Sequence, residues 1–87
     1  MSGITLAGVH SAGGIQLGGG NSVFKVNGSP AVVLGDPVAG HGSSPHDAPV
    51  MTGGSPSFRI NGVPVIRTGD TASCGHTTNG LATFNIP

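Results

Sequence analysis

One stretch of the chain decides the fold, and it occurs twice. Residues Phe24–Asp36 read FKVNGSPAVVLGD, and residues Phe58–Asp70 read FRINGVPVIRTGD, 34 positions later. Phe, Asn-Gly, Pro and Gly-Asp recur in place, Lys and Arg exchange for one another, and so do Val and Ile. A Gly-Gly pair precedes each copy. Such ordered self-similarity indicates an internal structural repeat.

Each copy is typical of a β-hairpin. A short alternating run ends at Asn-Gly, and a second extended run follows. Asn and Gly tolerate the positive φ angles of a type I′ turn, so this pair is the strongest short hairpin signal. Asp36 and Asp70 end the second runs, and we interpret them as turn residues that accept local backbone N–H bonds. No segment has a helical period, so the sequence predicts an all-β fold.

The two ends of the chain resemble the halves of a third copy. Residues 4–8 (ITLAG) are similar to the second half of a unit, and residues 84–86 (FNI) are similar to the first half. We therefore expect the first strand to pair with the last. That pairing would create three similar sides around one axis and would remove two free sheet edges.

Composition limits the classes of protein to which the chain can belong. Its 87 residues predict a single domain spanning 1–87, with only three aromatic side chains for a core. A scaffold this small usually needs a staple, and the lone Cys74 excludes an internal disulfide. The net charge is zero, which argues against a nucleic-acid or acidic-lipid partner. The N-terminus does not resemble a signal peptide, and no apolar run is long enough to span a membrane.

Metal-ligand side chains are confined to three loops, at residues 9–14, 36–49 and 70–79. The second and third loops supply three histidines and one cysteine, a set that suits tetrahedral zinc in a closed structural site. Iron or nickel could fit similar ligands, but zinc is the metal that we expect. We interpret His10, in the first loop, as a solvated side chain. The predicted metal ligands are His41, His46, Cys74 and His76.

Three other functions could use the same residues. A zinc-dependent hydrolase would need an open coordination position and a general base, yet the chain has no Glu and the plausible ligands are taken up by the metal. A nucleophile–base pair at Cys74 and His76 lacks an evident orienting acid. A zinc module that binds nucleic acid would need more than three Lys and Arg residues. We therefore expect a protein that is not an enzyme.

The repeat and the loop ligands together resemble the PAAR-repeat family. The copies at Phe24–Asp36 and Phe58–Asp70 are close to its VFVNGKPAARVGD unit, and Ser73–His76 resembles its SCGH loop. The PAAR tetrapeptide itself reads PAVV and PVIR here. Val9 stands where the family often has Asp, and His10 precedes the usual position of the tip histidine. For that reason His10 is left out of the first-choice ligand set.

The resemblance implies a cone with a pseudo-threefold base and a metal-bound tip, typically zinc held by three His and one Cys. Its base would cap a trimeric β-helical central spike, as one monomer per trimer, in a contractile phage tail, a tailocin or a type VI secretion system. The tip would then touch the target cell envelope transiently while piercing it. The chain would reside at a virion tail tip, or in the cytoplasm before export. Many relatives carry a toxin domain, but in a chain of 87 residues we expect no such effector extension.

Overall fold

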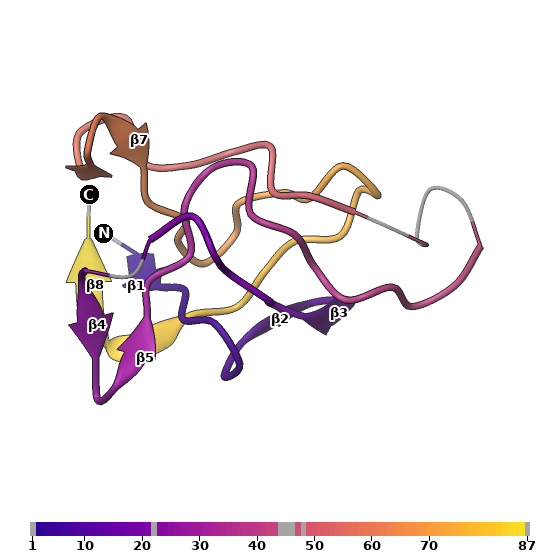
Figure 1. Cartoon of the computed structure of the whole chain (residues 1–87), viewed down its shortest axis with the longest axis horizontal. Helices are drawn as coiled ribbons and strands as arrows, with labels where there is room; N and C mark the ends of the chain where they lie inside the picture. Colours follow the sequence, from indigo (N-terminus) through magenta and orange to yellow (C-terminus); the bar gives the residue numbers. More distant parts are fainter. Residues whose placement is uncertain (1, 22, 44–46, 48, 87) are drawn as a thin grey trace.

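Eight short strands make up the regular structure of the chain (Figure 1). The computed structural model describes residues 2–21, 23–43, 47 and 49–86. No helix occurs in these ranges, and so none that could cross a membrane. The all-β prediction is confirmed. The strands are β1 (Ser2–Ile4), β2 (Ser11–Ala12), β3 (Gly14–Ile15), β4 (Lys25–Val26), β5 (Ser29–Pro30), β6 (Arg59–Ile60), β7 (Val63–Pro64) and β8 (Leu81–Ile86).

The two copies of the repeat form the predicted hairpins, β4–β5 and β6–β7. Asn27 and Gly28 connect the first pair with φ angles of 54° and 84°. Asn61 and Gly62 connect the second with φ angles of 52° and 80°. Positive φ at both central residues is what a type I′ turn requires, and its twist matches that of the flanking strands. The Asn-Gly pairs therefore set both hairpins.

The first and last strands close a third unit, as the sequence predicts. β1 and β8 are antiparallel, with Gly3 opposite Asn85 and a bulge before Ile4 meets Leu81. A Cβ atom on Gly3 would collide with the Leu81 backbone, so this close pairing needs glycine. Chain ends far apart in sequence thus complete one side of the molecule.

A ring of three backbone hydrogen bonds joins the three units. The Thr5 N–H donates to the Ile66 carbonyl (3.0 Å), the Ile66 N–H to the Val32 carbonyl (2.8 Å), and the Val32 N–H to the Thr5 carbonyl (2.9 Å). Each unit therefore donates to one neighbour and accepts from the other. This cyclic pattern defines a pseudo-threefold axis through the ring.

The apolar core lies in two layers. Neighbouring residues on an extended chain point to opposite sides, so each unit contributes to both layers. Val32 and Ile66 belong to one layer and their neighbours Val33 and Val65 to the other. The first layer contains Ile4, Leu6, Ala31, Val33, Val65 and Ile86. The second contains Ala12, Val32, Val38, Met51, Ile66 and Ala72, with Cys74 packed against it.

The molecule tapers along its longest direction (Figure 1). Its principal extents are 32 × 24 × 22 Å. The hairpins β4–β5 and β6–β7 and the β1–β8 pair gather at one end, which we call the base. Loops that contain residues 39–43 and 73–77 extend to the other end, which we call the tip. The tip is therefore built from loops, and its ligand-type side chains come from two of the three units.

Candidate metal centre at the tip

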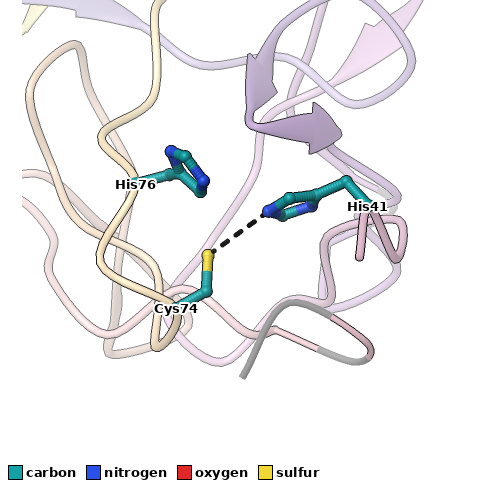
Figure 2. A group of neighbouring side chains, drawn as sticks. All are labelled: His41, Cys74 and His76. Atoms are coloured by element: carbon teal, nitrogen blue, oxygen red, sulfur yellow. Dashed lines mark hydrogen bonds between the residues drawn. The ribbon is translucent and has the colours of Figure 1, made fainter. Parts of the chain in front are cut away.

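Three of the four predicted ligands lie together at the tip. One ligand atom from each of His41, Cys74 and His76 falls within 4.8 Å of the other two. Figure 2 shows all three side chains turned toward a common space. The fourth predicted ligand, His46, lies outside the described residues. His41 and Cys74 are half-buried and His76 is exposed.

A tight turn presents Cys74 and His76 on the same side. The Ala72 N–H donates to the His76 carbonyl (2.9 Å), and the Gly75 N–H donates to the Ala72 carbonyl (3.0 Å). Gly75 lies between the two ligand residues with a φ of 94°, which favours glycine. The Cys-Gly-His sequence thus forms one compact turn with two donor side chains.

The His41 ring is held in a tautomer that suits metal binding. Its Nδ1 lies 3.1 Å from the Ala39 carbonyl oxygen. A carbonyl can only accept, so Nδ1 carries the proton and Nε2 has the lone pair that a metal ion would need. Nε2 is the atom that faces Cys74, 3.7 Å from Sγ (Figure 2). The backbone therefore orients the ring and leaves the ligating nitrogen pointing into the site.

Gly13, between β2 and β3, forms one wall of the site. A Cβ atom at this position would lie 2.6 Å from His41 Nε2 and 2.7 Å from His76 Cδ2. The two rings it adjoins have centroids 4.9 Å apart and are inclined at 66°. Gly13 also has a φ of 83°, which disfavours other residues. The first loop therefore contacts the site through the backbone of a glycine, and it contributes no ligand within the described residues. Sequence reasoning missed this role.

The donor set fits a metal ion of the zinc class. Thiolate and imidazole are the ligands of structural zinc, and tetrahedral bonds to them place S and N about 3.5 Å apart. The 3.7 Å between Cys74 Sγ and His41 Nε2 is close to this spacing. One ligand atom of His76 lies within 4.8 Å of both. The group could bind a metal ion, and a closed tetrahedral shell would take one more ligand.

His10 is not solvated, and that interpretation was wrong. The residue is only 8% exposed, and its Nδ1 accepts a hydrogen bond from the Leu6 N–H. In the other two units Asp36 Oδ2 and Asp70 Oδ2 accept the equivalent bonds from residues 33 and 67. The two Asp residues are therefore turn residues, as predicted. His10 replaces them in the first unit, where the exposed Val9 offers no acceptor.

Burial also affects the titration of His10. Desolvation lowers the pKa of the imidazole below the usual value for histidine. The neutral ring is the form that the turn needs, because a protonated Nδ1 cannot accept from Leu6. His10 thus has a structural role apart from the three tip residues.

A comparison with protein-family models shows the family of the chain. The model described as PAAR motif matches residues 7–78, a range that spans both repeats and all three tip residues. The chain belongs to the PAAR-motif family. This family is associated with spike-tip proteins of contractile injection systems. No curated protein is similar enough to the chain to count as a match. The resemblance read from the repeated unit and the Ser73–His76 loop is thereby confirmed.

Proposed function

We propose that the chain caps a trimeric β-helical central spike and sharpens its tip. The observation that carries this proposal is the cyclic hydrogen bonding of Thr5, Val32 and Ile66. A monomer with three similar sides can meet three identical chains through three similar contacts, which avoids a symmetry mismatch. Membership of a family associated with spike tips supports the same role.

The function is mechanical. Contraction of a sheath drives the spike forward, and the tapered tip concentrates force on a small area of the target cell envelope. The host machine is a contractile phage tail, a tailocin or a type VI secretion system, and the chain resides at the tail tip or in the cytoplasm before export. No chemical step and no nucleic-acid partner belong to this role.

The tip residues have a structural task in this proposal. His41, Cys74 and His76 would hold a zinc ion, with His46 as the fourth ligand. A bound zinc ion supplies crosslinks between loops and folding free energy, on the order of 10 kcal/mol in small zinc peptides. The chain needs such a staple because its two core layers contain twelve buried apolar residues of modest size. Crosslinked loops would keep the tip from splaying under load.

Native mass spectrometry of the chain mixed with the trimeric spike of its own system tests the proposal. We expect one copy of the chain on each spike trimer. Three copies per trimer, or no complex at micromolar concentration, would contradict the capping role. Elemental analysis of the purified chain tests the staple separately, with about one zinc per chain expected.

A further inference from the structure

Three phenylalanines form a cluster at the base. The Phe24 ring lies 5.6 Å from that of Phe58 and 6.0 Å from that of Phe84, in edge-to-face arrangements at 84° and 85°. Each unit contributes one ring. The rings pack on the first core layer and remain half-buried, so part of this aromatic cluster is still exposed. Clustered aromatic side chains are the usual centre of a protein–protein interface.

The residue after each phenylalanine is exposed and polar. Lys25 follows Phe24, Arg59 follows Phe58, and Asn85 follows Phe84. They occupy equivalent places, since Lys25 is opposite Pro30, Arg59 opposite Pro64, and Asn85 opposite Gly3. Two corners of the base thus carry a cation and the third carries an amide. We call these three residues the rim.

The charges of the rim are not balanced by the rest of the base. Asp70 accepts from the Arg67 backbone and lies 3.4 Å from the Arg67 guanidinium. Asp36 is buried and caps its own turn. Within the described ranges neither Lys25 nor Arg59 has a carboxylate partner. Asp47, the third of the three acidic residues, lies beside Gly40 in a tip loop. Positive charge therefore concentrates at the base.

We infer that the base recognises a trimeric end with an apolar centre and an acidic side chain on each of its three chains. The inference rests on the proposed function and specifies the chemistry of the partner. The aromatic cluster would cover the apolar centre. Lys25 and Arg59 would face two of the acidic groups, and Asn85 would donate a hydrogen bond to the third. A pseudo-threefold rim is suited to a threefold ring of carboxylates.

The small number of cations in the rim favours a protein partner over a nucleic acid or a membrane. Two cations supply little of the counterion release on which nucleic-acid binding depends. They also fall short of the four to eight basic residues that mark an acidic-lipid site. At a protein interface, however, rim charges steer association and set its salt dependence, while the buried centre supplies most of the affinity.

The experiment measures association rates between the chain and its spike trimer over a series of salt concentrations. A double variant, Lys25→Gln with Arg59→Gln, removes both charges. The matched control, Lys25→Arg with Arg59→Lys, exchanges the cations and keeps the charge. At low salt we expect the neutral variant to associate roughly tenfold more slowly and to lose most of its salt dependence. The control should behave like the unmodified chain.

Each outcome has a distinct meaning. If the unmodified chain does not bind the spike, the proposed function fails. If it binds, and the neutral variant keeps the same rate and salt dependence, the acidic-rim inference is overturned while capping stands. Binding to phosphatidylglycerol vesicles that the neutral variant loses, with spike binding unchanged, would also overturn the inference and assign the charges to a membrane. Circular dichroism of all variants checks that the fold is kept.

Discussion

The Nδ1 atom of His10 accepts a hydrogen bond from the Leu6 N–H at 3.0 Å, and in the first unit this bond replaces the Asp-capped turn of the other two. A histidine cap differs from an aspartate cap in one important respect. Protonation of the imidazole in acid turns the acceptor into a donor. The first loop, which carries the glycine wall of the tip, is therefore held by an acid-sensitive bond.

Acid should destabilise the first unit. The pKa of buried His10 is lowered from the value of 6.5 that it has when unfolded. The unfolded chain then binds more protons than the folded chain below that pH, so folding stability falls as pH decreases from about 6.5. Above this pH the contribution is complete. We expect thermal unfolding temperatures that are level from pH 8 to 7 and decline from pH 6.5 to 5.

A double variant can distinguish the loss of stability caused by His10 protonation from the release of bound metal in acid. Acid releases metal from any site with histidine ligands. Val9→Asp combined with His10→Ser gives the first unit the Asp found at the same place in the other two. The decline between pH 6.5 and 5 should then become shallower. An identical decline in both proteins would show that His10 does not contribute.

Removing the His10 side chain should cost stability without removing metal. His10→Ala leaves the Leu6 N–H buried without its acceptor, a loss of about 1–3 kcal/mol. Zinc content, measured on the purified variant, should stay at the level of the unmodified chain. A variant that loses zinc along with stability would place His10 in the metal site after all.

Replacing a tip residue, unlike replacing His10, should reduce the zinc content. Cys74→Ser and His76→Gln each remove a donor from the group, so both should lower bound zinc and the unfolding temperature together. His46→Ala should do the same if His46 is the fourth ligand. Chelation of the unmodified chain should reproduce the loss. Equal stability with and without chelator would contradict the staple.

The fold could be predicted from the sequence because its determinants are local and repeated. Asn27-Gly28 and Asn61-Gly62 require positive φ angles that few other residues adopt, and they set both hairpins. The second half-unit at residues 4–8 has no partner nearby in the sequence, so it had to pair with the other end of the chain. Cys74 and His76 share one short turn, which made their proximity predictable as well.

The role of His10 could not be predicted in the same way. Its neighbour Val9 occupies the place of Asp36 and Asp70, so the acceptor is displaced by one residue along the chain. Whether the next side chain turns inward depends on the path of the loop, and His10 does turn inward. The absence of Asp from the first unit was the one sequence feature that could have indicated this role. A turn that lacks its usual acceptor needs another, and an adjacent histidine is a candidate.

Gly13 contacts the metal site only through the tertiary fold, so the sequence could not predict its role. Two glycine variants can separate the effect of this contact from the backbone cost of replacing a glycine. Gly13→Ala adds a methyl group that would lie 2.6 Å from His41 Nε2, at a φ of 83°. Gly8→Ala adds the same methyl group at a φ of 76°, with no atom within 4 Å. Both changes carry a backbone cost of about 1–2 kcal/mol. Only the change at Gly13 also displaces two ligand rings.

We therefore expect the two variants to unfold at similarly reduced temperatures in the presence of chelator, where the shared backbone cost dominates. With metal present, Gly13→Ala should bind zinc at least roughly tenfold more weakly, because groups that orient ligands commonly affect affinity to that extent. Gly8→Ala should keep the affinity of the unmodified chain. Competition with a chromogenic zinc chelator measures both. If the two variants bind zinc equally well, the first loop is not a wall of the metal site, and the contact of Gly13 with His41 has no role in holding the ion.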